Sequence, residues 1–235
     1  MGFFYSILNH MNIESIYKIF CQENKVTTDS RIKQDGGIFF ALKGENFDGN
    51  TFASIAIENG ANYAIIDNAD YKKDERYILV NNVLESLQQL AQYHRQQFKF
   101  PVIGITGTNG KTTTKELVNA VLKSRFKTFC TKGNLNNHIG VPLTILSIPT
   151  DAEFAIIEMG ANHPHEIAEL CEIADPDFGI ISSIGKAHLE GFGSYENIIK
   201  TKKELYDHVA IKKGTLFVNA DDTLLTSISV SYTHL

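Results

Sequence analysis

The 235-residue chain carries 22 lysines and arginines against 27 aspartates and glutamates, a formal net charge of -5. This mildly acidic balance argues against an electrostatic binder of nucleic acid. Hydrophobic residues make up 43% of the chain, enough for a buried core, and the length allows one or two domains. No apolar run approaches the ~20 residues of a membrane span. The three cysteines lie far apart without metal-binding spacing, which predicts a reducing, cytoplasmic location.

The first residues, 1–10, are apolar but lack the basic start and the cleavage site of a signal peptide. We interpret them as an N-terminal extension or a misplaced start, because a more ordinary amphipathic stretch opens at Met11.

Short apolar segments then alternate with helical patterns as far as residue 98. In the last of these helices, Val83, Leu87, Leu90 and Ala91 recur with a helical period. The pattern predicts a small α/β domain over 1–98. Its helices are expected at 12–20, 51–61 and 82–98, and its strands at 36–44, 63–67 and 77–80.

A second α/β pattern covers 99–235. Strands are expected at 101–106, 127–131, 154–160, 178–184 and 215–220, and helices at 111–124, 165–173 and 194–209. Short apolar strands alternating with helices predict a mostly parallel sheet that is covered on both faces. In the last stretch, 219–235, we expect only a strand end and a turn, with no closing element, so this domain is expected to be incomplete.

The helix expected at 111–124 carries four apolar residues that the helical period places on one face. They are Leu117, Val118, Val121 and Leu122.

Residues 104–114, GITGTNGKTTT, resemble a phosphate-binding loop with unusual spacing. The standard pattern G-x-x-x-x-G-K-[ST] would place a glycine where this chain has Ile105. A strand, a glycine-rich turn and a helix opening with Lys111 and Thr112 are nevertheless the context that phosphate binding needs. The alternative is a plain strand-to-helix turn rich in small residues. The agreement of all four features favours nucleotide binding.

Each part of this loop has a chemical use. Backbone N–H groups at a helix N-terminus attract phosphate oxygens. Lys111 can reach the β- and γ-phosphates, and the Thr112 hydroxyl can bind Mg²⁺. Gly107 and Gly110 let the backbone curl tightly. The predicted nucleotide-binding residues are Gly107, Thr108, Asn109, Gly110, Lys111, Thr112 and Thr113.

Glu158 ends the apolar run FAIIE. A carboxylate at the carboxyl end of a parallel strand faces the ligand crevice. Mg²⁺ prefers oxygen ligands, so we assign Glu158 and Thr112 to one Mg²⁺. The alternative is a solvated carboxylate at a strand end.

The stretch GTNGKTTT, residues 107–114, resembles the loop of the Mur ligase family, the ATP-dependent amide-forming enzymes of peptidoglycan synthesis. Further stretches narrow the resemblance to the family members that join D-alanyl-D-alanine to UDP-N-acetylmuramoyl-tripeptide. These stretches are 133–144, 158–167, 187–194 and the N-terminal segment TDSR…GGIFFALKGENFDGNTF. The resemblance runs from about Met11 to Asp222.

The resemblance implies an N-terminal domain that binds the UDP substrate, followed by a P-loop ATPase-type domain. We expect this chain to lack the family's third, C-terminal domain. We therefore expect binding of the UDP substrate and weak binding of ATP, with little or no ligation.

The resemblance also implies roles for two residues of the second domain. His188 would be a ligand of a second Mg²⁺, and Lys202 would be carbamylated by CO₂ and so become an anion that holds Mg²⁺. Without the motif, His188 would be a structural or exposed histidine, and Lys202 would belong to a solvated basic face with Lys200 and Lys203.

The remaining polar residues of the motifs have weaker assignments. By resemblance, Asn134 and Asn137 contact the muramoyl-peptide or the phosphates, although an asparagine-rich turn needs no function. His138 is given no role. His163 and His165 are interpreted as capping or surface groups near a helix start.

Two segments of the N-terminal domain are similar to the family's uridine-nucleotide-binding segments. Their candidates are Ser30, Arg31, Asp48 and Gly49. Arg31 could pair with a diphosphate. The alternative at 48–50 is a type I′ or type II turn, which is compatible with binding.

The reaction implied by the resemblance is ATP-driven peptide bond formation. The terminal carboxylate of UDP-N-acetylmuramoyl-tripeptide attacks the γ-phosphate of ATP, and the amine of D-alanyl-D-alanine then attacks the acyl phosphate. Lys111 and two Mg²⁺ ions would offset the repulsion between the two anions, with Glu158, His188 and Lys202 as the other catalytic candidates.

Three other functions stay open from the sequence. One is another Mur-type ligase or a folylpolyglutamate synthase, although the uridine-type segment speaks against the folate enzyme. The second is a non-catalytic nucleotide-binding module. A switch GTPase is least favoured, since no N-K-x-D motif is present.

Overall fold

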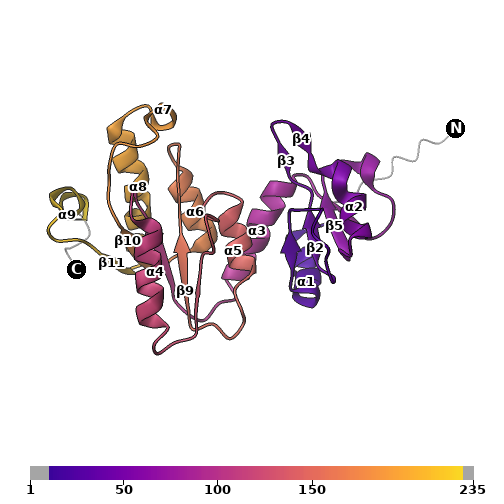
Figure 1. Cartoon of the computed structure of the whole chain (residues 1–235), viewed down its shortest axis with the longest axis horizontal. Coiled ribbons are helices and arrows are strands. Elements are labelled where there is room, and N and C mark those ends of the chain that lie inside the picture. The colour runs from indigo at the N-terminus through magenta and orange to yellow at the C-terminus, as the bar shows by residue number, and fades with distance from the viewer. Residues whose placement is uncertain (1–10, 230–235) are drawn as a thin grey trace. The chain divides into compact units, whose positions relative to one another are not determined.

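Two units make up residues 11–229, which are the residues that the computed structural model describes (Figure 1). Unit 1 ends at Tyr93 and unit 2 begins at His94, so the break falls inside helix α3, Val83–Arg95. The predicted domain boundary after residue 98 lies a few residues further along the chain. The extension 1–10 and the end of the tail, 230–235, lie outside the described residues.

Unit 1 is built on a four-stranded sheet with the order β1-β2-β5-β6, in which every neighbouring pair is parallel. Its strands are β1 (Val26–Thr27), β2 (Ile38–Phe40), β5 (Tyr63–Ile66) and β6 (Tyr77–Leu79). Its helices are α1 (Ile13–Glu23), α2 (Ala53–Glu58) and α3. The predicted apolar face of α3 is confirmed, since Val83, Leu87, Leu90 and Ala91 are all buried.

The strand expected at 36–44 is wrong in its length. It divides into β2 and β3 (Lys43–Gly44), and β3 pairs antiparallel with β4 (Phe47–Asp48). A 3₁₀ turn, Gly49–Phe52, follows and leads into α2. The type I′ or type II turn at 48–50 is also wrong, because Asp48 is extended and caps this 3₁₀ turn by accepting from Asn50 N.

Unit 2 contains a five-stranded sheet with the order β11-β10-β7-β9-β8, again with every pair parallel. Its strands are β7 (Val102–Thr106), β8 (Thr128–Cys130), β9 (Phe154–Glu158), β10 (Phe178–Ile181) and β11 (Thr215–Phe217). The predicted α/β class with parallel sheets is confirmed.

Helices cover both faces of this sheet. Because side chains alternate along a strand, neighbouring residues of β7 face opposite layers. Ile103 and Ile105 pack on Val118 of helix α4 (Lys111–Leu122). A Cβ atom on Gly104 would instead lie 2.9 Å from Leu205 of helix α8 (Tyr195–Ile211).

Two further helices cover this sheet, α5 (Gly140–Leu146) and α6 (Glu166–Ala174). Of these, α6 packs against α8 and α5 packs against α6. Helix α5 was not predicted from the sequence. None of the helices within 11–229 is both long and apolar enough to cross a membrane.

The single apolar face predicted for α4 is wrong. Val118 and Leu122 pack against the sheet, but Leu117 and Val121 are 63% and 71% exposed. The inward face of α4 is completed by the buried Lys115 instead.

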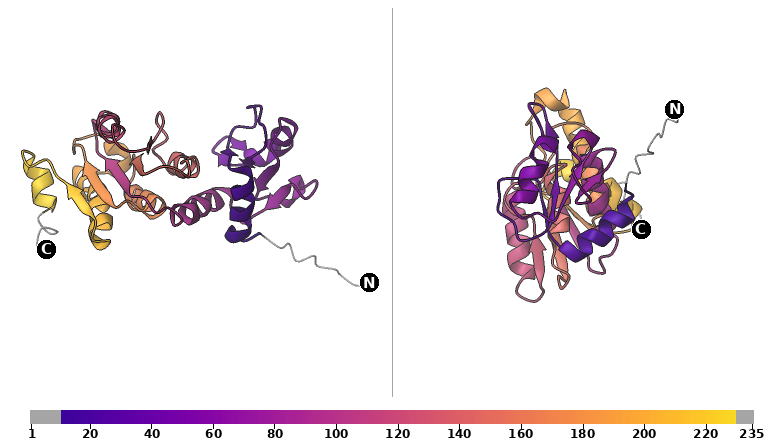
Figure 2. Two further views of the ribbon diagram at one scale, coloured as in Figure 1. Left: turned by 90° about the horizontal axis from the view of Figure 1, so that it is seen from below. Right: turned by 90° about the vertical axis from the view of Figure 1, so that its right-hand side faces the viewer.

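The expectation for the tail is also wrong within the described residues. A helix, α9 (Thr223–Ser229), follows β11, and Figure 2 shows it as the last coloured element of the chain. Asp222 starts it by accepting from Leu224 N and Leu225 N, both at 3.0 Å.

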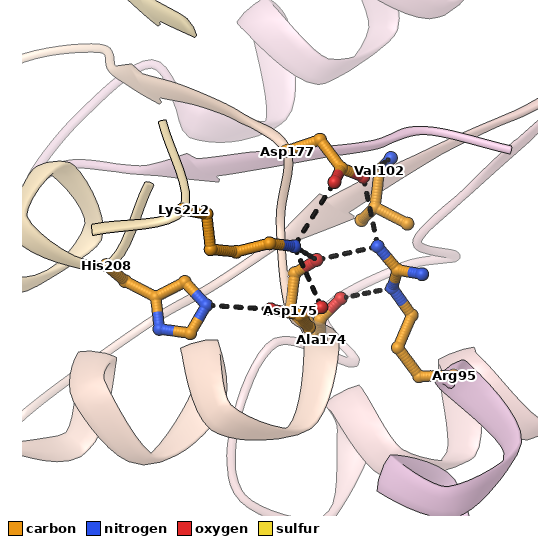
Figure 3. A network of polar contacts seen from close by, with 7 residues as sticks. All are labelled: Arg95, Val102, Ala174, Asp175, Asp177, His208 and Lys212. Atoms are coloured by element: carbon orange, nitrogen blue, oxygen red, sulfur yellow. Dashed lines mark hydrogen bonds and ion pairs between the residues drawn. The ribbon is translucent and has the colours of Figure 1, made fainter. Parts of the chain in front are cut away.

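A network of ion pairs fastens the amino end of the sheet (Figure 3). We call Arg95, Asp175, Asp177, His208 and Lys212 the amino-edge network. Arg95 lies 3.0 Å from Asp177, and Lys212 lies 2.8 Å from Asp175 and 3.1 Å from Asp177. Asp177 also accepts from the first N–H of β7, at Val102. The network therefore joins α3, α6, α8 and the starts of two strands.

Candidate functional site

The predicted phosphate loop lies at the carboxyl end of β7, where the chain turns into α4. Gly107 and Gly110 have φ angles of +147° and +80°, which glycine adopts without strain. A Cβ atom at Gly107 would also clash with Ser182 Oγ. Ile105 is fully buried within β7, so the departure from the standard spacing extends the strand rather than disrupting the turn.

The loop is held in place by the segment that follows β10. Ser182 Oγ and Ser183 Oγ donate to Asn109 O at 2.7 and 3.0 Å. Thr108 N donates to Ser183 O at 2.8 Å, and Thr108 Oγ1 accepts from Gly185 N at 2.9 Å. Thr108 and Asn109 are thus fixed by backbone and hydroxyl contacts. Sequence reasoning missed both serines, although two hydroxyl residues after an apolar strand were a visible signal.

The Lys111 ammonium lies over the loop. Its Nζ atom donates to Gly107 O at 2.8 Å and to Thr108 O at 3.2 Å. Burial lowers the pKa of Lys111, and the charge of Glu158 partly opposes that change. A half-buried cation therefore stands at the mouth of a glycine-rich turn, beside a helix N-terminus.

Glu158 is surrounded by hydrogen-bond donors. Its Oε2 accepts from Thr112 Oγ1 at 3.0 Å, and its Oε1 accepts from Asn136 Nδ2 at 2.9 Å. Its backbone N–H donates to Thr131 Oγ1 at 2.9 Å. Because the residue is only 2% exposed, the alternative of a solvated strand-end carboxylate does not describe it.

The oxygen atoms at Glu158 and Thr112 fit a magnesium ion that is bound jointly by the protein and by a nucleotide. Thr112 and Glu158 offer oxygen atoms next to the loop. Within 11–229, no group of three or more His, Cys, Asp or Glu residues could hold a metal by itself. Mg²⁺ usually takes one or two carboxylate ligands and completes its shell with water and phosphate oxygens. Two protein oxygens are therefore sufficient here.

A cavity of about 390 Å³ opens beside the loop and brings most of the predicted unit 2 candidates together. Its walls include Gly107, Thr108, Lys111, Asn134, Asn137, His188 and Lys202. Glu166 also lines the cavity, but its Oε2 accepts from Asn162 N and His163 N. The cavity thus joins the phosphate loop to the residues that follow β8, β9 and β10.

Lys202 is the most buried of the three neighbouring lysines, at 3% exposure. Burial, and next the charge of Lys111, lower its pKa to about 8. Its Nζ lies 5.8 Å from the centre of the Phe192 ring. Lys200 and Lys203 instead pair with Glu196 and Asp207 along α8, as the solvated-face alternative predicts.

The histidines differ in position. His188 lines the cavity at the start of helix α7 (Leu189–Phe192), with a left-handed φ of 53°. His163 lies 3.2 Å from Glu166, and His165 lies 3.4 Å from Glu204. His165 occupies the N-cap position of α6, but its side chain forms no cap hydrogen bond.

The asparagines that follow β8 make different contacts. Asn137 Oδ1 accepts from Gly140 N at 2.8 Å at the start of α5, and both Asn134 and Asn137 line the cavity. Asn136, which sequence reasoning did not select, contacts Glu158 directly and accepts from Gly160 N at 2.7 Å.

The four uridine-nucleotide candidates all belong to unit 1. The Ser30 carbonyl accepts from Asn59 at 2.8 Å, and the exposed Arg31 pairs with Asp29 at 2.7 Å. Asp48 accepts from Asn50, and Gly49 packs so closely that a Cβ atom would clash with Leu42 O. The first pair lies after β1, and the second pair lies where β4 meets the 3₁₀ turn.

A family model described as the Mur ligase middle domain matches residues 105–232. The chain belongs to the Mur ligase family. A second model, described as the Mur ligase family catalytic domain, matches residues 24–95. The two matches fall on either side of the segment 96–104.

Relatives of known name agree with this assignment. UDP-N-acetylmuramoyl-tripeptide–D-alanyl-D-alanine ligase of Bacillus subtilis is 41% identical over 202 residues, which cover 85% of this chain and 44% of the relative. The ligase of the same name from Escherichia coli is 39% identical and is covered to 43%. The chain thus spans less than half the length of these Mur ligases.

Solved structures of Mur ligases share the fold. MurF from Acinetobacter baumannii superposes with a TM-score of 0.79 at 37% identity, covering 87% of this chain and 45% of that one. MurF ligase from Thermotoga maritima, solved in complex with ADP, gives a TM-score of 0.73 at 38% identity, covering 79% of this chain and 43% of that one.

Proposed function

We propose that the chain binds ATP with Mg²⁺ and serves the reaction that joins D-alanyl-D-alanine to UDP-N-acetylmuramoyl-tripeptide. The observation that carries the proposal is the convergence of Lys111, Thr112 and Glu158 at the carboxyl ends of β7 and β9, beside a cavity that Lys111 and Lys202 line. The names of its Mur ligase relatives supply the substrates. The structure of a relative with ADP supports the nucleotide.

The first chemical step brings together two anions, a carboxylate and the γ-phosphate of ATP. A carboxylate oxygen forms a bond to the γ-phosphorus. The bond from that phosphorus to the oxygen bridging the β- and γ-phosphates breaks, which gives an acyl phosphate and ADP. Lys111 and the N–H groups of the first turn of α4 would offset the negative charge. The amine of D-alanyl-D-alanine then attacks the acyl carbon, releases phosphate and loses a proton.

Thr112 and Glu158 would hold one Mg²⁺, which would supply charge neutralisation at the phosphates. For the second expected Mg²⁺, the cavity offers His188 and, after carbamylation, Lys202. In that reaction the neutral Lys202 amine bonds to the carbon of CO₂ and releases a proton. Its lowered pKa, about 8, supports the reaction because it raises the fraction of neutral amine.

Unit 1 would bind the uridine-nucleotide part of the substrate through Ser30, Arg31, Asp48 and Gly49. The Arg31 guanidinium already pairs with Asp29. A diphosphate at Arg31 would therefore have to replace that carboxylate as its partner.

Isothermal titration of the 235-residue chain with ATP and Mg²⁺ tests the nucleotide site. Wild-type protein is expected to bind, and Lys111→Met should bind about 10- to 100-fold more weakly, because a hydrogen bond to a charged group contributes about 1.5–3 kcal/mol. The matched control is Lys212→Met in the amino-edge network, which should keep wild-type affinity. A wild-type chain that shows no binding, or a Lys111→Met variant with unchanged affinity, would contradict the proposal. A separate ligation assay tests the expectation of little or no ligation by this chain.

A further inference from the structure

Lys115 is a buried lysine that the reaction proposed above does not use. It lies on α4, one helical turn after Lys111, and is 1% exposed. Its Nζ donates to the backbone carbonyl of Thr131 at 2.6 Å and lies 3.0 Å from Glu116 Oε1. The Glu116 side chain is 60% exposed, so the contact with Thr131 is the buried one.

A lysine in this place needs a reason. Burying a charged ammonium is costly unless it is paired and hydrogen-bonded, and an apolar residue of similar size is often neutral or stabilising there. The inward face of α4 otherwise uses apolar residues, Val118 and Leu122, to contact the sheet. What Lys115 adds to that face is a directed hydrogen bond to one carbonyl.

That carbonyl belongs to the residue that holds the backbone of Glu158. Thr131 is fully buried just after β8, and its N–H donates to Ile156 O at 3.0 Å. Its hydroxyl accepts from Glu158 N at 2.9 Å. Thr131 therefore accepts one hydrogen bond from α4 through its carbonyl and one from β9 through its hydroxyl.

The side chain of Glu158 closes the ring. Its carboxylate accepts from Thr112, which lies three residues before Lys115 on the same helix. The ring thus runs from Lys115 through Thr131 and Glu158 to Thr112 and back along α4. Two contacts from one helix fix both the backbone and the carboxylate of Glu158.

We propose that Lys115 is a positioning residue for the magnesium ligands Thr112 and Glu158. Through Thr131 it holds the end of β9 at a set distance from α4, so that the two oxygen ligands stay adjacent. This inference rests on the proposed function, because it takes Thr112 and Glu158 as the metal ligands. A purely structural role would make Lys115 matter for stability alone.

The variant Lys115→Met tests the inference, since it keeps an unbranched side chain of nearly the same length and removes the donor. The Mg²⁺ concentration that half-maximally enhances ATP binding should rise about 10- to 100-fold, the range found when a group that orients a metal ligand is removed. Binding of ATP in EDTA should stay close to wild type, although loss of the buried donor to Thr131 O should lower the midpoint of thermal unfolding. The matched control is Lys127→Met, at an exposed ion pair with Asp151 just before β8, which should change neither value.

Amide hydrogen exchange supplies a measurement that needs no metal. The Glu158 amide should exchange faster in Lys115→Met than in wild type, because its acceptor Thr131 is less firmly held. The same amide should be unchanged in Lys127→Met.

Should Lys115→Met fail to fold, the pair Thr131→Val and Thr131→Ser tests the same ring. Valine removes the hydroxyl that accepts from Glu158 N, whereas serine keeps it. The valine variant should require more Mg²⁺ and exchange Glu158 faster, and the serine variant should lie nearer to wild type. If both Lys115→Met and Thr131→Val fold, their combined effect should be smaller than the product of their separate effects, as expected for groups in one network.

The outcomes separate this inference from the proposed function. Unchanged Mg²⁺ dependence and unchanged Glu158 exchange in both Lys115→Met and Thr131→Val would overturn the inference. If wild-type protein shows no Mg²⁺-dependent ATP binding, the proposed function fails and the metal-positioning role fails with it. The exchange measurement would then show whether the ring from Lys115 to Glu158 exists as a structural contact alone.

Discussion

The two ends of the sheet in unit 2 carry their charges in opposite ways. At the amino end, Arg95, His208 and Lys212 are matched by Asp175 and Asp177 (Figure 3). The four ion pairs of that network are 3.1 Å or shorter. The charges satisfy one another, so this end offers little to a ligand.

At the carboxyl end the cations are not matched in this way. Within residues 11–229, neither Lys111 nor Lys202 takes part in an ion pair, although both line the cavity. The carboxylate of Glu158, at the carboxyl end of β9, accepts from Thr112 and Asn136 instead. This difference indicates that the amino end is organised for stability. The carboxyl end instead holds partly or fully buried cations, and a bound anion would offset the cost of burying them.

Replacing Arg95 should produce the largest loss of stability. Arg95→Met leaves Asp177 and the carbonyls of Ala174 and Asp175 without the guanidinium that now contacts them. Breaking a buried pair costs about 3–5 kcal/mol, and we expect about 3 kcal/mol because Asp177 is partly exposed. Urea denaturation of the 235-residue chain measures the loss. Titration of the folded variant with ATP and Mg²⁺ should show wild-type affinity.

The matched control for Arg95 is Arg76→Met, which removes an exposed arginine paired with Asp74 at 2.6 Å. Exposed pairs of this kind contribute little, so no measurable change is expected. Equal losses in the two variants, or a loss of nucleotide affinity in Arg95→Met, would break the contrast between the two ends of the sheet.

The parallel sheet of unit 2 could be predicted because its central strands are apolar runs that are buried on both faces. The strands 102–106 and 154–158 are both of this kind. The failures have local causes. Helix α5 opens with Gly140, Val141 and Pro142, a sequence typical of a turn, and proline is tolerated there because the first turn of a helix needs no N–H partner. The four-residue apolar face assumed for α4 was wrong because Lys115 takes one of its inward positions.

The candidate site shows the same limit. Lys111, Thr112 and Glu158 could be selected because each opens a helix or ends a strand in a recognisable motif. Asn136 and Thr131 could not, because their importance comes from contacts with Glu158 across 22 and 27 residues of sequence. The roles assigned to His188, Lys202 and the uridine-nucleotide residues remain predictions.

Replacing Lys202 should change the free energy of unfolding in the opposite direction to replacing Arg95. In CO₂-free buffer at pH 7, Lys202→Met should raise the free energy of unfolding by roughly 2 kcal/mol, because it removes a buried cation beside Lys111. The pKa of Lys202 is lowered to about 8 in the folded protein, so folding is linked to proton release between pH 8 and 10.5. The wild type should therefore become more stable, relative to the variant, as the pH rises through this range.

Urea denaturation at pH 7 and pH 10 measures that difference, with the exposed Lys200→Met as the matched control. Lys200→Met should show no gain at either pH. A Lys202→Met variant that is less stable than wild type at pH 7 would mean that Lys202 is already balanced, and the contrast with the amino-edge network would not hold.

The smallest expected effect comes from Asp175 at low pH. The hydrogen bond from His208, followed by that from Lys212, lowers the pKa of Asp175 to about 2. Its folded pKa is below its unfolded value, so the carboxylate contributes stability that is present above about pH 4 and is lost as the pH falls through 2. Because the side chain is 41% exposed, solvent screening reduces the contribution to about 1 kcal/mol.

Asp175→Asn, which keeps the shape and tolerates the left-handed φ of 41°, should lack this contribution. The stability difference between wild type and Asp175→Asn should therefore shrink by about 1 kcal/mol between pH 4 and pH 2. A difference that stays constant over that range would show that the amino-edge network does not hold Asp175 as a carboxylate, and that its ion pairs are weaker than their distances suggest.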